Sequence, residues 1–112
     1  MSKLDPTLPL TPAVFHILLA LAGGECHGYR IMQEVERLTS GQLNLGPGTL
    51  YRSIQRMLLD GLIEETKEAA DTGTDDERRR VYRLTQFGRE VARAESRRLE
   101  VLVESARRRK LL

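Results

Sequence analysis

The chain has 112 residues, of which 40% are apolar and 30% are charged, and its formal net charge is +2. This length predicts one domain with a modest core, and it excludes a deep catalytic cleft with a second lobe; the composition is that of a globular chain. The single cysteine excludes an intrachain disulfide framework, and no apolar run is long enough to cross a bilayer, so we expect a cytoplasmic protein.

The N-terminal part of the chain predicts two helices. Thr11 followed by Pro12 is a typical helix start, the apolar residues that follow recur with helical spacing, and Gly23 belongs to the pair that ends the run. A second helix is expected between His27 and Gly41, because its apolar residues form one stripe with charged residues outside it.

The stretch GPGTLYRSIQRMLLDGLIEE, residues 46–65, predicts a third helix with one buried face. An extended segment at 42–45, at most one strand of a small sheet, leads into it. Pro47 sets the start of the helix, and Gly61 stands where a helix end requires a left-handed backbone. The apolar face, which recurs at i, i+4, i+7 and i+8, consists of Leu50, Ile54, Met57 and Leu58.

The opposite face of this third helix carries cationic and hydrogen-bonding side chains. Because Gly46 and Gly48 have no side chains, a sugar-phosphate backbone can approach the first turn of this helix. The free N–H groups of that turn attract an anion. Arg52 and Arg56 are one helical turn apart, and their forked guanidinium groups suit phosphate and guanine. The exposed positions are Thr49, Arg52, Ser53 and Arg56, with Tyr51 and Gln55 at the margins.

Two segments with strand character follow. Residues 63–69 and 79–85 are separated by a polar loop at 70–78, and in the second segment Tyr82 and Leu84 alternate with their neighbours as in a half-buried strand. These segments predict a two-stranded hairpin with a long tip.

A long final helix is expected from Gln86 to about Arg109, with Thr85 as its cap. At ~1.5 Å per residue it spans roughly 36 Å, which is farther than a core of three short helices extends. Its thin apolar stripe therefore needs a partner, and the same helix of a second copy is the simplest one. The stripe consists of Val91, Leu99, Leu102, Val103 and Ala106.

The predicted fold is mainly α with a small β-hairpin, in the element order of a winged helix-turn-helix. Residues 1–85 would form the DNA-binding domain and residues 86–112 the C-terminal dimerisation helix, together as one structural unit. In this fold the third helix enters the major groove, which is about 12 Å wide, and the hairpin flanks it. Double-stranded DNA is therefore the expected partner.

Four motifs make the sequence resemble the PadR family of bacterial transcriptional regulators. They are His-Gly-Tyr at 27–29, Gly-Thr-Leu-Tyr at 48–51, Asp-Gly-Leu-Ile at 60–63 and Tyr-Arg-Leu-Thr at 82–85. The match spans roughly residues 10–93, and the combination of motifs is specific. The resemblance implies a homodimer bound to a pseudo-palindromic operator, usually as a repressor. It also implies that the last helix and the first helix, including Phe15, form the dimer contact.

Carried over residue by residue, the resemblance implies DNA contacts from the second helix, the third helix and a basic wing: Tyr29, Gly48, Thr49, Tyr51, Arg52, Arg56, Arg78, Arg79 and Arg80. The sequence departs from the family pattern in three places. Arg52 replaces a usual proline, Leu58-Leu59 replaces an acidic pair, and the acidic run 75–77 at the wing tip precedes the wing arginines.

Other functions are less well supported by the residues. Cys26 and His27 are neighbours whose side chains diverge, so they form no nucleophile with its base, and together with His16 they are too few for a zinc site. We therefore expect no enzyme, no cofactor and no metal. The alternative is a winged helix whose arginine face binds an acidic protein and no DNA.

A small-molecule effector at the dimer interface is a further expectation. The chain has no tryptophan and only 4% aromatic residues. A stacking pocket would therefore depend on Phe15, Phe87 or a tyrosine.

Overall fold

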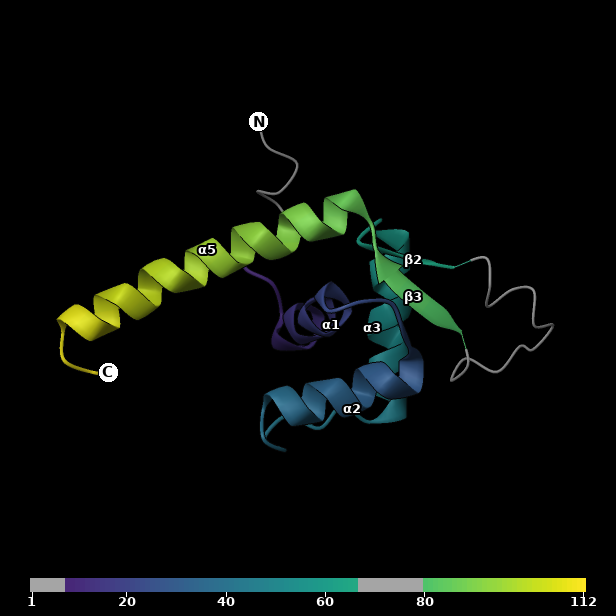
Figure 1. Cartoon of the computed structure of the whole chain (residues 1–112), viewed down its shortest axis with the longest axis horizontal. Helices are drawn as coiled ribbons and strands as arrows, with labels where there is room; N and C mark the ends of the chain where they lie inside the picture. Colours follow the sequence, from purple (N-terminus) through teal and green to yellow (C-terminus); the bar gives the residue numbers. More distant parts are fainter. Residues whose placement is uncertain (1–7, 67–79) are drawn as a thin grey trace.

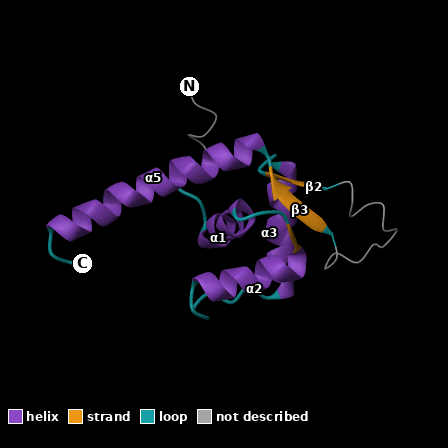
Figure 2. Ribbon diagram, viewed as in Figure 1, coloured by secondary structure: helices purple, strands orange, loops and turns teal. Residues whose placement is uncertain are grey.

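The computed structural model describes residues 8–66 and 80–112. In chain order, its elements are α1 (Pro12–Ala22), β1 (Cys26–His27), α2 (Gly28–Leu38), α3 (Pro47–Leu59), β2 (Ile63–Glu65), β3 (Val81–Leu84) and α5 (Gln86–Arg108) (Figure 1). Helices dominate and the strands gather in one small sheet at one end of α5 (Figure 2). The predicted fold class is confirmed.

Helix boundaries follow from local hydrogen bonds. The Thr11 hydroxyl accepts from the N–H of Val14 at 3.3 Å, and the Thr85 hydroxyl accepts from the N–H of Gly88 at 2.9 Å. Gly61 has a φ of 76°, and across it the N–H of Leu62 donates to the Met57 carbonyl at 2.9 Å. The predicted starts of α1 and α5 and the glycine-dependent end of α3 are thus confirmed.

The sheet differs from the predicted hairpin by one strand. Its order is β1-β3-β2, all antiparallel, with Cys26 opposite Tyr82 and Glu64 opposite Arg83. The third strand is β1, whereas residues 42–45 form no strand. No sequence pattern predicts β1, because two residues are too few for an alternating pattern.

The core forms where the apolar faces of α1, α2 and α3 meet the sheet and the first half of α5. Ile17, Ile31 and Leu50 have no exposed surface, and Leu62 and Ile63 carry the core into β2. Burial of these side chains supplies the main favourable free energy of folding, at about 25 cal/mol per Å² of apolar surface. The apolar face predicted for α3 is confirmed in Leu50, Ile54 and Met57, which are all buried.

Val91 belongs to this core and not to a surface stripe. Its side chain is 0% exposed within a single chain. A side chain without exposed surface has nothing to offer a second copy, so the assignment of Val91 to the dimer contact is wrong. Val91 lies eight residues before Leu99, and helical periodicity places both on one side of α5, which explains the error.

The first turn of α5 rests directly on the backbone that follows α3. A Cβ atom at Gly88 would lie 1.9 Å from the carbonyl oxygen of Leu62. Beside it, the Thr85 N–H donates to the same carbonyl at 3.1 Å, and the Thr85 hydroxyl donates to the Gly61 carbonyl at 2.5 Å. We call this contact the α5 seat. It ties the orientation of α5 to the end of α3.

Beyond the core, α5 projects past α1 into solvent (Figure 1). Its buried residues, Gly88, Val91, Ala92 and Glu95, all come from its first half. In the projecting half, Val101 is 65% exposed, Leu102 54% and Val103 43%. The projecting helix predicted from the sequence is therefore present, with its apolar side chains uncovered in one chain.

A buried carboxylate joins the segment before α1 to α5. Glu95 is 2% exposed and accepts a hydrogen bond from the Leu10 N–H at 2.9 Å. It also accepts from Nη2 of Arg98 at 3.2 Å. The hydrogen bond from Arg98, helped by that from Leu10, lowers the pKa of the Glu95 carboxyl despite its burial. Glu95 therefore remains ionised at neutral pH.

Candidate nucleic-acid interface

The start of α3 is small and uncapped. Gly46 is the N-cap residue with an extended backbone (φ −66°, ψ 160°), and no side chain caps the helix. Gly46, Pro47, Gly48 and Thr49 are all exposed. The first-turn N–H groups of α3 thus carry the positive end of the helix dipole to the surface, which is a favourable position for a phosphate.

Arg52 and Arg56 extend from the exposed side of α3. The Nε atom of Arg52 donates to the carbonyl of Gly48 at 3.3 Å, and Arg52 makes no ion pair within the described ranges. Arg56 lies 3.3 Å from a carboxylate oxygen of Asp60, one turn later, and its side chain is 75% exposed. Neither guanidinium group is buried or held by two carboxylate oxygens, so both can reorient toward a ligand.

Tyr51 occupies a different position from the one predicted. Its ring packs against Gly28 at the start of α2, where a Cβ atom would lie 2.8 Å from the Tyr51 hydroxyl oxygen. That oxygen is buried. Direct contact of the Tyr51 hydroxyl with DNA is therefore not available in this conformation. Instead, the absence of a side chain at Gly28 creates the space in which α2 and α3 pack together.

The remaining polar residues of the predicted surface are accessible. Tyr29, in the first turn of α2, is 51% exposed. Thr49 and Gln55 are exposed, and Ser53 is half-buried. The structure thus brings Tyr29 and the start of α3 to the surface through two helices that pack on each other, as helix-turn-helix geometry requires.

The wing carries ion pairs that the sequence did not suggest. Nε of Arg80 lies 3.4 Å from a carboxylate oxygen of Glu65, and Nε of Arg83 lies 2.9 Å from one of Glu64. Arg80 is therefore partly neutralised by its neighbouring strand. Arg78, Arg79 and the acidic run 75–77 lie outside the described residues.

Arg30 is a candidate that sequence reasoning missed. It is exposed in the first turn of α2, next to Tyr29. In helix-turn-helix proteins the helix before the recognition helix crosses the sugar-phosphate backbone, so a cation in its first turn is well placed for phosphate. The signal was present in the sequence as the cation following the His-Gly-Tyr motif.

The exposed surface at the starts of α2 and α3 is rich in hydrogen-bond donors. Among the described residues, no group of three or more histidine, cysteine, aspartate or glutamate side chains is arranged to hold a metal ion. In the same ranges, no helix combines the length and hydropathy that a bilayer crossing requires. The surface presents guanidinium, hydroxyl and amide groups beside an open helix N-terminus.

These features define a winged helix-turn-helix protein. The chain matches the transcriptional regulator PadR-like family over residues 17–94, and it belongs to that family. The resemblance inferred from the four motifs is thus confirmed.

Two sequence relatives place the chain further. The transcriptional regulator Rv3488 of Mycobacterium tuberculosis is 37% identical over 87 residues, covering 78% of this chain and 75% of the relative. An uncharacterised 37.1 kDa protein in a transposon of Streptomyces fradiae is 34% identical over 80 residues, which cover 71% of this chain but only 21% of that protein.

Solved structures share the fold at lower identity. A transcriptional regulator from Clostridium thermocellum superposes with a TM-score of 0.68 at 20% identity, covering 96% of each chain. RosR of H. salinarum superposes with a TM-score of 0.64 at 23% identity, covering 88% of this chain and 79% of RosR. These two likenesses show that the fold of this chain is shared over most of its length.

Proposed function

We propose that the chain is a DNA-binding transcriptional repressor that occupies a pseudo-palindromic operator as a homodimer. The observation that carries this proposal is the exposed face of α3, where Arg52 and Arg56 stand one turn apart beside an uncapped helix start. A repressor that covers a promoter needs only such a surface and a second copy, and no catalytic group.

The pairing of Arg56 with Asp60 is compatible with DNA binding. A solvent-exposed i,i+4 pair contributes about 0.3–0.5 kcal/mol. A bidentate contact between arginine and the correct base contributes about 1–3 kcal/mol of discrimination. Arg56 therefore gains more from a contact with DNA than it loses when it leaves the Asp60 carboxylate.

A selection of bound fragments from random DNA tests the proposal. We expect a palindrome whose half-sites are separated by about one duplex turn, roughly 34–36 Å, or a multiple. Arg52→Ala and Arg56→Ala should each weaken operator binding by about 1–3 kcal/mol and relax specificity where the side chain reads a base. Equal losses on operator and random DNA would assign the residue to phosphate.

Arg37→Ala is the matched control, because Arg37 is an exposed arginine paired with Glu34 near the end of α2, far along the helix from Tyr29. It should leave operator affinity unchanged. Binding to DNA should also fall with salt, with a slope of about −0.9 per neutralised phosphate. Absence of a DNA complex at low salt, with retained binding to an acidic protein, would contradict the proposal and favour the protein-binding alternative.

The homodimer is proposed from the projecting half of α5. Leu99 and Ala106 are half-buried, and Leu102 and Val103 are exposed on the same helical side. Phe15 on α1 is a half-buried aromatic residue that would extend this stripe. A homodimer would bury this stripe against the same stripe of a second copy, and no other protein is needed.

Leu102→Asp tests the dimer, with Val101→Asp as its control. At about 100° per residue, Val101 lies roughly 150° around the helix from the centre of the stripe formed by Leu99, Leu102, Val103 and Ala106. We expect Leu102→Asp to dissociate the dimer and Val101→Asp to preserve it, as measured by solution mass at several concentrations. A wild-type chain with the mass of a monomer at all concentrations would refute the dimer.

A further inference from the structure

Arg52 has a defined place on the exposed side of α3. It is the sixth residue of the helix, which begins at Pro47. Its Nε atom donates to the Gly48 carbonyl at 3.3 Å, so the side chain lies back along the helix toward its start. The Nη2 atom lies 4.0 Å from the place that a Cβ atom would take at Gly48. The guanidinium group therefore lies against the first turn of α3, where glycine leaves room for it.

The two terminal nitrogen atoms of Arg52 remain available for a ligand. The hydrogen bond to Gly48 uses only Nε, and within residues 8–66 and 80–112 Arg52 makes no ion pair and no further hydrogen bond. Arg52 is also exposed. Because the helix backbone holds Nε, the planar guanidinium group offers Nη1 and Nη2 as a pair of donors side by side.

Two donors side by side match one base edge in the major groove. Guanine presents O6 and N7 there as two acceptors, whereas adenine presents one acceptor and one donor. Thymine presents one acceptor beside a methyl group, and cytosine presents a donor. A guanidinium group has no acceptor for the donors of adenine or cytosine. Guanine is therefore the base that uses both free donors of Arg52.

Arg56 is in a different situation. It lies one turn further from the start of α3, about 6 Å along the axis at ~1.5 Å per residue. Its Nε atom lies 3.3 Å from an Asp60 carboxylate oxygen. In helix-turn-helix proteins the N-terminal residues of the recognition helix contact base edges. The base contact therefore falls to Arg52, and Arg56 is available for phosphate.

The start of α3 can hold the helix in register on the duplex. No side chain caps its first-turn N–H groups, and both Gly46 and Gly48 are exposed. A phosphate bound at these N–H groups carries no sequence information, but it fixes the position of the helix. With α3 fixed in this way, Arg52 would meet the same base pair in every complex.

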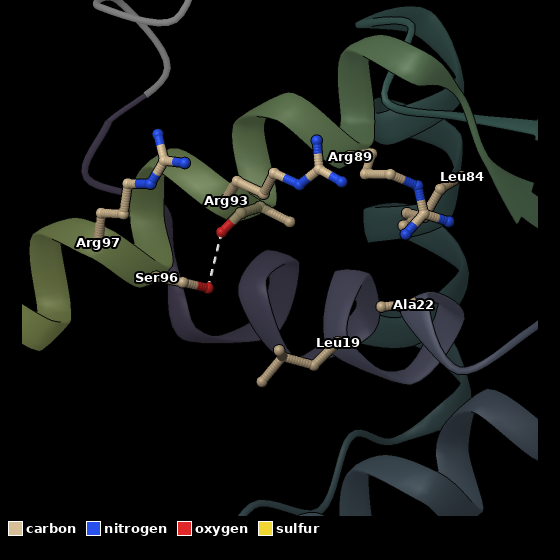
Figure 3. A pocket seen from close by; sticks show the side chains of 8 residues that line it. Leu19, Ala22, Leu84, Arg89, Arg93, Ser96 and Arg97 are labelled. Atoms are coloured by element: carbon tan, nitrogen blue, oxygen red, sulfur yellow. Dashed lines mark hydrogen bonds between the residues drawn. The ribbon is translucent and has the colours of Figure 1, made fainter.

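A second group of arginines lies on α5 and belongs to a different surface. Arg89, Arg93 and Arg97 border a hollow of about 280 Å³ whose other lining residues come from α1, β3 and α5 (Figure 3). The proposed dimer joins α1 and α5 of two copies, so these arginines lie where a second copy is expected. Base recognition therefore does not fall to them.

We propose that Arg52 is a specificity-determining residue that reads one guanine in each operator half-site, with Nη1 and Nη2 donating to O6 and N7. The inference rests on the proposed function, and it adds the identity of one base and the residue that selects it. Because the dimer is symmetric, the palindrome contains this guanine once in each half-site, at the same distance from its centre.

The experiment uses the full chain and the operator selected from random DNA. Each guanine of the half-site is replaced in turn, in both half-sites, by 7-deazaguanine, which pairs with cytosine but has no N7 acceptor. We expect one position at which this replacement weakens binding of the wild-type chain about ten-fold or more, which corresponds to about 1.4 kcal/mol. Hypoxanthine at the same position keeps O6 and N7 and lacks only the amino group in the minor groove, so it should leave affinity nearly unchanged.

Two variants assign the contact to a residue. Arg52→Ala should bind the guanine and 7-deazaguanine operators equally, whereas Arg56→Ala should bind both more weakly and keep the difference between them. Low salt keeps the binding of both variants measurable, because phosphate contacts are strongest there. A selection repeated with Arg52→Ala should return half-sites in which this position is no longer guanine.

Three results would overturn the inference. The first is an operator in which no guanine is sensitive to the loss of N7. The second is a sensitivity that persists in Arg52→Ala, which would assign the contact to another side chain, and the third is a sensitivity that only Arg56→Ala removes. If the wild-type chain selected no DNA, the proposed function would fail as well, whereas a bound operator with any of these three results would refute the role of Arg52 alone.

Discussion

Gly88→Ala should destabilise the chain through a single added methyl group. The new Cβ atom would lie 1.9 Å from the Leu62 carbonyl oxygen and 2.8 Å from its carbonyl carbon. Both are backbone atoms in the α5 seat, so no side-chain rotation relieves the overlap and α5 must move away from the end of α3. Overpacking of this kind costs about 1–3 kcal/mol. The higher helix propensity of alanine returns about 0.5–1 kcal/mol, which does not offset a cost in the upper part of that range.

Urea unfolding of wild type and variant, at one protein concentration, measures this effect. We expect a loss of about 2 kcal/mol, because an overlap with backbone atoms belongs at the top of the overpacking range, about 3 kcal/mol, and the propensity gain returns about 1 kcal/mol. Gly48→Ala is the control, because a Cβ atom there meets only the flexible Nη2 atom of Arg52 at 4.0 Å. It should leave stability equal or raised by up to about 1 kcal/mol. If Gly88→Ala were as stable as Gly48→Ala, the close contact of α5 with Leu62 would not exist in solution.

The buried carboxylate and the glycine at the start of α2 give two further tests. The pKa of Glu95 is lowered in the folded chain, so its contribution to stability is present above the pKa of an unfolded glutamate, about 4.3, and is lost as the pH falls through the folded value. Glu95→Gln should therefore reduce stability at pH 7 by about 1–3 kcal/mol and flatten its acid dependence, measured by urea unfolding at several pH values. An unchanged acid dependence would show that other groups dominate it. Gly28→Ala should force the Tyr51 ring out of its site, since the added Cβ atom would lie 2.8 Å from the Tyr51 hydroxyl oxygen. We expect an altered tyrosine fluorescence and weaker operator binding, and an unperturbed Tyr51 signal would contradict the packing described above.

Local patterns were sufficient for most of the fold. Thr11, Thr85 and Gly61 act through their own backbone neighbourhood, so their effects on helix ends are visible in a short stretch of sequence. The apolar face of α3 was equally readable, because helical periodicity alone determines which side chains share a side.

Contacts between distant segments were not readable in the same way. The strand β1 exists because Cys26 and His27 pair with β3, more than fifty residues later. Gly88 and Leu62 meet only after α5 has packed, and no local pattern distinguishes Gly88 from a glycine that merely weakens a helix. Tyr51 was assigned to the DNA surface because it lies at the margin of the exposed face of α3 and belongs to the Gly-Thr-Leu-Tyr motif. In the structure its ring packs into the space left by Gly28.

The DNA surface lay between these two cases. The exposure of Arg52 and Arg56 followed from the periodicity of α3, yet the ion pair with Asp60 depends on side-chain rotamers. On the wing, the pairing of Arg80 with Glu65 depends on strand register, which the sequence did not specify. Periodicity thus predicted the exposed surface, whereas the ion pairs on it depend on the folded arrangement of α3 and the strands.

The α5 seat leaves the first turn of the last helix little room to move, so a change in the angle of α5 at Gly88 moves its whole projecting half. From Gly88 to its last residue, Arg108, α5 measures about 30 Å at ~1.5 Å per residue, so a tilt of about 10° at Gly88 displaces its far end by roughly 5 Å. In a symmetric pair joined through those far ends, a tilt of this size would change the spacing of the two α3 helices by more than one base-pair step, which is about 3.4 Å. Both α3 helices would then fit successive major grooves of the duplex at one orientation of α5 and not at neighbouring orientations.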